Sequence, residues 1–93
     1  DEMMGDLYKK TEELIAAAEK CVESGDMNEL AARGHEIHGM TGNFGLTALS
    51  QIAETMRHQA RGGLPIETIA ATIRQLRPVF ANTRETINNW IKE

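Results

Sequence analysis

The 93-residue chain lacks several features that would point to particular functions. Its one cysteine, Cys21, cannot form an internal disulfide, which fits a reducing compartment. No stretch reaches the roughly 18 consecutive apolar residues of a membrane span, so we expect no direct membrane contact. Basic residues are not in excess: the formal net charge is −4, which disfavours nucleic acid as a partner because phosphate binding requires a basic surface. The length suits one hydrophobic core, so we expect a single domain over residues 1–93.

What the chain does contain is a helical spacing of apolar residues. Four segments, 3–22, 27–44, 46–60 and 66–90, place apolar residues three and four positions apart, the period of an amphipathic helix. Turn-forming and capping residues separate them: Gly25, Asp26, Gly45, Gly62, Gly63 and Pro65. No segment alternates with a period of two. We therefore predict an all-α fold, an antiparallel four-helix bundle with short connections.

The apolar stripes also predict which side chains form the core. The fourth segment has the longest stripe, from Ile66 to Trp90, and Pro78 lies off it, so Pro78 should bend this helix without removing a core side chain. Cys21 lies on the first stripe and is predicted to be a buried small hydrophobe. The second stripe runs through Gly34 to Phe44, and Gly34 on it would allow a close helix crossing.

The second segment carries a histidine beside several small residues. His35 is one residue off the apolar stripe, which rotates it by about 100° toward solvent. Its neighbours on that flank, three, four or seven residues away, are Ala31, His38, Gly39 and Gly42. Each glycine inside a helix costs about 0.5 to 1 kcal/mol relative to alanine, so their presence calls for a compensating role. Gly39 and Gly42 would leave the His35 imidazole open to another protein.

The sequence also limits the chemistry available to that imidazole. A neutral histidine has a free ring-nitrogen lone pair and can act as a nucleophile. A hydrolase is not favoured, because Ser24 and Ser50 are expected in a turn and on a helix surface. No phosphate loop is present, so the chain should not take a phosphoryl group from ATP unaided. His35 and His38 are too few to hold a structural zinc ion, so we expect no metal site. What remains is a histidine that accepts a group delivered by a partner.

Residues 35–46 read HEIHGMTGNFGL and follow GDMNELAARG over residues 25–34. This segment closely resembles the active-site segment of histidine-containing phosphotransfer (HPt) domains of bacterial phosphorelays. In that family the histidine is followed by an aliphatic residue at +2, usually lysine at +3, glycine at +4, and a polar, an apolar and a glycine residue at +8 to +10. The aliphatic residue and the two glycines correspond to Ile37, Gly39 and Gly45. The resemblance extends over the rest of the bundle.

The resemblance implies that His35, exposed on the second helix, is phosphorylated and exchanges the phosphoryl group with an aspartate of receiver domains of response regulators or of the same hybrid kinase. The receiver would bring Mg²⁺ and an acidic pocket, so this chain would need no cofactor of its own and would lack ATP-dependent kinase activity. Docking would centre on the second and third helices, with His38 and Gly39 beside the reacting group. The other candidate contacts are Ala31, Gly42, Arg57 and Arg61.

Two residues depart from the family pattern. The usual lysine at +3 is His38, so the charge near the phosphoryl group would depend on pH. The family often has glutamine or glutamate at +22 to bind the second ring nitrogen, but here that residue is Arg57, which has no acceptor for an imidazole N–H. Arg57 could instead attract the phosphoryl oxygens. Whether Glu54, one turn earlier, reaches His35 stays open at this level.

Because the chain begins at Asp1 and not at methionine, we expect a fragment of a longer protein, the resemblance indicating a hybrid sensor histidine kinase. The module would then be cytoplasmic, either free or tethered to the inner membrane through its parent, and monomeric when isolated. Two alternatives stay open. The chain could be the phosphoacceptor domain of a chemotaxis-type kinase, or a non-catalytic helical adaptor in which His35 has no chemical role.

Overall fold

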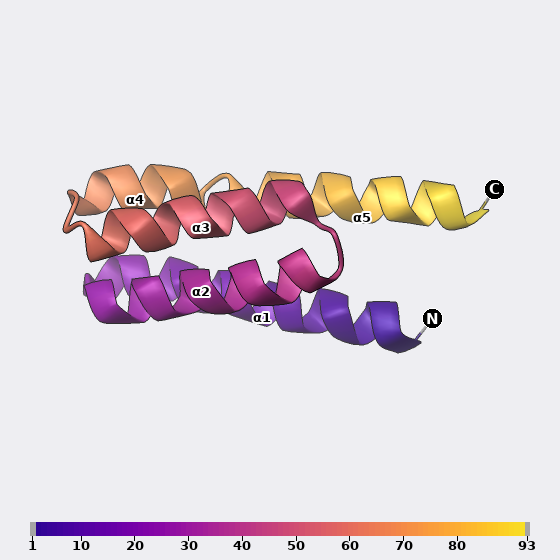
Figure 1. Cartoon of the computed structure of the whole chain (residues 1–93), viewed down its shortest axis with the longest axis horizontal. Helices are drawn as coiled ribbons and strands as arrows, with labels where there is room; N and C mark the ends of the chain where they lie inside the picture. Colours follow the sequence, from indigo (N-terminus) through magenta and orange to yellow (C-terminus); the bar gives the residue numbers. More distant parts are fainter. Residues whose placement is uncertain (1, 93) are drawn as a thin grey trace.

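A computed structural model describes residues 2–92 of the chain, with side chains for residues 4–90. The described residues form five helical segments: α1 (Glu2–Ser24), α2 (Met27–Asn43), α3 (Thr47–Arg61), α4 (Ile66–Ile73) and α5 (Leu76–Lys92). Successive segments run in opposite directions, except that α5 continues in the direction of α4 (Figure 1). The two form one broken leg, so the predicted all-α bundle with four antiparallel legs is confirmed. The bundle is elongated, with a longest extent of 44 Å.

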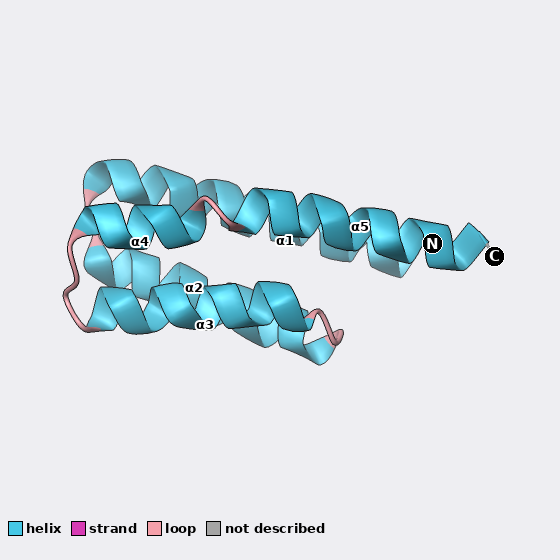
Figure 2. Cartoon of the chain, turned by 90° about the horizontal axis from the view of Figure 1, so that it is seen from above, coloured by secondary structure: helices cyan, strands magenta, loops and turns pink. Residues whose placement is uncertain are grey.

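The ends of the helices follow the turn residues of the sequence. Gly25, Gly45 and Gly63 have φ values of 71°, 73° and 69°, a left-handed conformation that side chains rarely adopt, and each lies just beyond a helix. At the start of α2, the Asp26 carboxylate accepts a hydrogen bond from the backbone N–H of Glu29 at 3.1 Å. The loops are therefore short, and neighbouring legs are held side by side (Figure 2).

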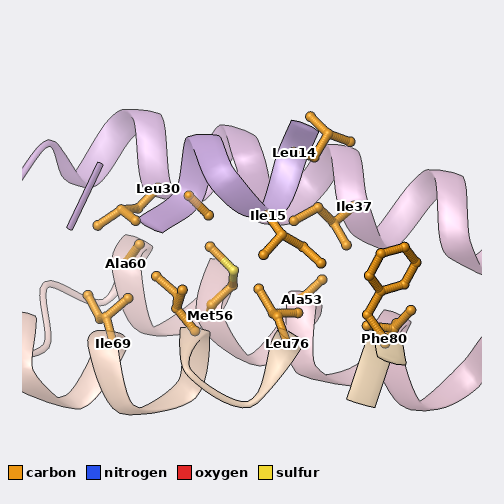
Figure 3. Close-up of a cluster of buried hydrophobic side chains, with 13 residues drawn as sticks. Leu14, Ile15, Leu30, Ile37, Ala53, Met56, Ala60, Ile69, Leu76 and Phe80 are labelled. Atoms are coloured by element: carbon orange, nitrogen blue, oxygen red, sulfur yellow. The ribbon is translucent and has the colours of Figure 1, made fainter. Parts of the chain in front are cut away.

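The core is a row of aliphatic side chains enclosed by all the legs. Ile15 of α1, Leu30 and Ile37 of α2, Met56 of α3 and Leu76 of α5 are fully buried. Figure 3 shows these side chains pointing toward one another between the helices. These contacts determine which face of α2 is buried. They thereby also determine which residues of α2 lie on its exposed flank.

The fourth leg is interrupted four residues before Pro78. Proline has no N–H to donate to the carbonyl of Arg74, and its ring crowds that carbonyl. The helix therefore stops at Ile73, the backbone N–H of Gln75 bonds to the Thr72 carbonyl at 3.1 Å, and α5 begins at Leu76. Pro78 thus lies in the first turn of α5. The sequence predicted a bend in one helix, and the structure shows a break one turn earlier.

Three residues predicted in the core are more exposed than expected. Trp90, predicted on the core stripe, is 77% exposed, because the terminal turns of α5 extend with those of α1 beyond the loop that joins α2 to α3 (Figures 1 and 2). Phe44 is 45% exposed because α2 ends at Asn43 and the backbone turns away from the core there. Cys21 is half-buried at the edge of the core and is not fully enclosed.

Polar contacts join α5 to α1. The Arg77 guanidinium donates hydrogen bonds to both carboxylate oxygens of Glu19 at 2.7 and 2.8 Å, and also to Glu12 at 2.5 Å. Two turns further along α5, Arg84 lies over the Tyr8 ring, 4.6 Å from its centroid. Among the described residues, no helix combines the length and apolar character needed to cross a membrane.

Candidate functional site

His35 is the central residue of α2 and lies on its exposed flank. The residues on either side of it in the buried stripe, Gly34 and Ile37, face the core, which turns the imidazole away from the bundle. Among the described residues, none forms a hydrogen bond or an ion pair with the imidazole ring of His35. The predicted exposure of this histidine on the second helix is confirmed.

At Gly34, the backbone of α2 lies close to α3. A Cβ atom at Gly34 would lie 2.9 Å from the backbone oxygen of Ala53, 3.1 Å from the Cβ of Arg57 and 3.1 Å from the Cγ of Met56. The first of these contacts is with backbone and cannot be relieved by a rotamer change. Gly34 therefore permits the close helix crossing predicted from the sequence, and it brings the stem of Arg57 next to the residue that precedes His35.

Gly39 and Gly42 differ in their surroundings. A Cβ at Gly39 would meet no atom within 4 Å, so this residue leaves open space one turn beyond His35. A Cβ at Gly42 would lie 3.4 Å from Ser50 Oγ, which is ordinary contact with α3. Gly39 therefore has open space beside it, whereas Gly42, although exposed, lies against α3 at the end of that flank.

His38 lies between α2 and α3 and binds two residues of α3. Its Nδ1 is 2.7 Å from Ser50 Oγ and 3.1 Å from the Ser50 carbonyl oxygen, and its Nε2 is 3.1 Å from a carboxylate oxygen of Glu54. We call these three residues, Ser50, His38 and Glu54, the His38 clasp. The His38 clasp holds α2 against α3 one turn beyond His35. This is the part of α2 in which Gly39 and Gly42 lower the helix propensity.

The His38 clasp has hydrogen-bond partners in either protonation state of the ring. In the neutral form with hydrogen on Nε2, this N–H donates to Glu54 and the Ser50 hydroxyl donates to Nδ1. In the charged form, the Nδ1–H donates to the Ser50 carbonyl or hydroxyl oxygen and Nε2–H still donates to Glu54. Protonation of His38 therefore changes the charge of the site without breaking the contact between the helices.

Glu54 is shared by three basic side chains. The Arg57 guanidinium donates to one carboxylate oxygen at 2.5 Å, His38 binds the other, and His58 Nε2 lies 3.4 Å from the first. The hydrogen bond from Arg57 holds the pKa of the Glu54 carboxyl below its usual value, partial desolvation opposes this shift, and His38 and His58 lower the pKa further. The Glu54 carboxylate thus favours its ionised form and has basic side chains on three sides.

Sequence reasoning missed Ser50 and left Glu54 unassigned. Ser50 was expected on a helix surface, but only 7% of it is exposed, and its hydroxyl also lies 3.3 Å from the His38 carbonyl oxygen. The grouping of serine, histidine and glutamate does not form a hydrolase site, because the Ser50 hydroxyl is enclosed between α2 and α3, beside the ring and the carbonyl of His38. No signal in the sequence alone pairs His38 with Ser50, because that pairing depends on how the helices are aligned.

The remaining predicted contacts lie toward the other end of α2. Ala31 and Arg61 both line an open groove of about 650 Å³ between the start of α2 and the end of α3. Arg57 is half-buried between this groove and the His38 clasp, whereas Arg61 is exposed. The structure therefore brings the predicted contacts onto one flank of the α2–α3 pair. Within the described residues, no three or more histidine, cysteine, aspartate or glutamate side chains gather in a way that could hold a metal ion.

Residues 2–86 match the protein family described as Hpt domain. The chain belongs to the Hpt domain family. The match includes all of α1 to α4 and most of α5. Neither the curated proteins nor the solved structures contain a significant match to the chain. Hpt domains carry out histidine phosphotransfer in phosphorelays and interact with receiver domains, and this function fits a helical bundle that presents a histidine on an exposed flank.

Proposed function

We propose that His35 is the phosphoacceptor of this Hpt domain and that it exchanges its phosphoryl group with the aspartate of a receiver domain. The observation that carries the proposal is that His35 differs from the other two histidines. His38 and His58 both bind Glu54, whereas the His35 ring has no partner among the described residues and lies beside the open space at Gly39. A partner can therefore reach its ring nitrogens without breaking an existing contact.

The transfer step needs little more than a free ring nitrogen. The lone pair of the unprotonated nitrogen attacks phosphorus, the bond from phosphorus to the receiver's carboxylate oxygen breaks, and the electron pair of that bond remains on the carboxylate. The second ring nitrogen keeps its proton, so the new phosphoimidazole ring is cationic until that proton passes to solvent. The reverse step returns the phosphoryl group to the aspartate.

The receiver would approach along the flank that contains Gly39, His35 and the groove lined by Ala31 and Arg61. Arg61 and Arg57 offer positive charge to an acidic partner on this flank. The receiver would also supply Mg²⁺ to neutralise the charge on phosphorus, so this domain would contribute the nucleophile and its position without a cofactor of its own. One docked pair suffices, so the isolated domain would act as a monomer.

The proposal is tested by phosphoryl transfer from a panel of radiolabelled phospho-receivers to the domain. The acceptor variants are His35→Gln, His38→Gln and His58→Gln, each checked for helical content. We expect base-stable, acid-labile label on the wild type and on the His58 variant, and none on the His35 variant. Label that survives His35→Gln, or no label from any receiver on a folded wild-type domain, would contradict the proposal. Incubation with ATP alone should leave all four proteins unlabelled.

A further inference from the structure

The flank that holds His35 is a series of residue pairs between α2 and α3. Gly42 lies against Ser50, His38 binds Glu54, and Ala31 lines the same groove as Arg61. From Gly42 the α2 residues step back by four, three and four through positions 38, 35 and 31. The α3 residues step forward by four, three and four from Ser50 through positions 54, 57 and 61.

This alignment places His35 and Arg57 opposite each other, between the pair His38 and Glu54 and the pair Ala31 and Arg61. The close crossing at Gly34 supports this placement, because a Cβ on Gly34 would lie 3.1 Å from the Cβ of Arg57. Antiparallel helices keep one alignment over a few turns, so the residue opposite His35 follows from the pairs on both sides of it. Among the basic residues of α3, Arg57 is thus the one whose position along the helix axis is nearest to that of the His35 imidazole.

Arg57 has unused hydrogen-bonding capacity in the unphosphorylated domain. Its Nη1 donates to Glu54 at 2.5 Å, while its Nε is buried and has no acceptor among the described residues. Glu54 does not depend on Arg57 alone, because His38 and His58 bind the same carboxylate at 3.1 and 3.4 Å. Loss of Arg57 would therefore leave Glu54 with two basic partners.

We propose that Arg57 changes partner when His35 is phosphorylated: its guanidinium releases Glu54 and binds the phosphoryl oxygens, while His38 and His58 remain in contact with Glu54. This inference rests on the proposed role of His35 as phosphoacceptor. A phosphoryl group brings up to two negative charges and three acceptor oxygens, which match the guanidinium better than one shared carboxylate does. The domain would then sense its own phosphorylation through an arginine of α3.

His38 is less suited to this task although it is the next residue on the flank. Both of its ring nitrogens face Ser50 or Glu54, so it would have to break the clasp between α2 and α3 to turn toward His35. The guanidinium of Arg57 also offers paired N–H donors in one plane, which match phosphoryl oxygens better than an imidazole does. The donor to the phosphoryl group would thus come from α3 and not from α2.

The inference is tested without any receiver, by labelling the domain with phosphoramidate, a small phosphoryl donor, and following the phosphoryl group by ³¹P NMR. The signal of phospho-His35 is assigned by its absence in His35→Gln. The pH midpoint of the ³¹P chemical shift, which reports the loss of the last proton of the phosphoimidazole, is then compared among the wild type, Arg57→Gln and Arg33→Gln. Arg33 is a matched control because it lies on α2, pairs with Glu36 at 2.6 Å and carries the same charge.

A nearby cation favours the deprotonated, more negative form of the phosphoimidazole, so Arg57→Gln should raise the midpoint by about one pH unit, and Arg33→Gln should leave it unchanged. Arg57→Lys, which keeps a positive charge, should fall between. The Nε–H resonance of Arg57 should move on phosphorylation of the wild type. Equal midpoints in the wild type and both glutamine variants, with a stationary Arg57 resonance, would overturn the partner change and leave the role of His35 standing. A phosphoryl signal that persists in His35→Gln, with none assigned to His35, would overturn both.

Discussion

Two glycines on the same helix provide a sharp test of how α2 is built. Gly34 and Gly39 are both inside α2, so replacement of either by alanine removes the same amount of backbone freedom from the unfolded chain. They differ only in what a Cβ would meet. At Gly39 there is nothing within 4 Å, whereas at Gly34 a Cβ would lie 2.9 Å from the backbone oxygen of Ala53.

The expected changes in the free energy of unfolding have opposite signs. Gly39→Ala should stabilise the domain by about 0.5 to 1 kcal/mol, which is the difference in helix propensity at an open position. Gly34→Ala gains the same amount but must push α3 away, and overpacking costs about 1 to 3 kcal/mol. We expect a net loss of about 1 kcal/mol at Gly34, so the two variants should differ by about 2 kcal/mol.

Urea unfolding followed by circular dichroism measures both values, and thermal unfolding should show midpoints about 10 °C apart for a domain of this size. The result that would refute the reasoning is an equal gain in stability for both variants, because the helix crossing at Gly34 would then have room for a side chain. Gly34→Ala should also displace the stem of Arg57, so it should slow phosphoryl transfer more than its loss of stability alone explains.

Four further outcomes follow from the structure. Gly39→Leu should leave the helical content unchanged but reduce transfer from a phospho-receiver at least tenfold, and an unchanged rate would remove Gly39 from the docking surface. His38→Ala should lower the free energy of unfolding by about 1 kcal/mol, because it removes the bonds to Ser50 and Glu54; no change in urea unfolding would show that the His38 clasp adds nothing. The pKa of Glu54 lies below its ordinary value of 4.5 in the folded chain, so its ionised form stabilises the fold above that pH. This contribution should be lost as the pH falls through the folded value, and the acid dependence should weaken in Glu54→Gln. Trp90, the one tryptophan, should emit like a solvated indole and be quenched fully by iodide.

The sequence was sufficient to predict those parts of the fold that depend on local chemistry. Left-handed turns require glycine and a helix start favours a side-chain acceptor, so Gly25, Asp26 and Gly45 marked the ends of helices correctly. The period of the apolar residues likewise predicted the exposure of His35. The break at Arg74 could also have been predicted, because the position four residues before Pro78 loses its hydrogen-bond donor.

Other features depend on how far each helix runs beside its neighbours, which periodicity does not contain. The stripe through Trp90 has the right spacing for a core residue, but the terminal turns of α5 extend beyond the loop between α2 and α3, so these two helices do not cover them. Ser50 looked like a surface residue because it is polar, and it is buried because the alignment of α2 with α3 puts His38 against it. The same alignment determines which cation faces His35, so the sequence could name Arg57 as a candidate but not its partner.

The position of the two chain ends bears on how this protein can be handled. The terminal turns of α1 and α5 extend together past the loop between α2 and α3, so both ends leave the bundle at the same pole (Figures 1 and 2). His35 is the central residue of α2, roughly 12 Å along the axis from either end of that helix. An affinity tag, a fluorophore or a surface linker attached at either terminus would therefore project away from the exposed flank. Both ends can serve for immobilisation in a transfer assay, and the orientation of the captured protein would leave the histidine facing the solution.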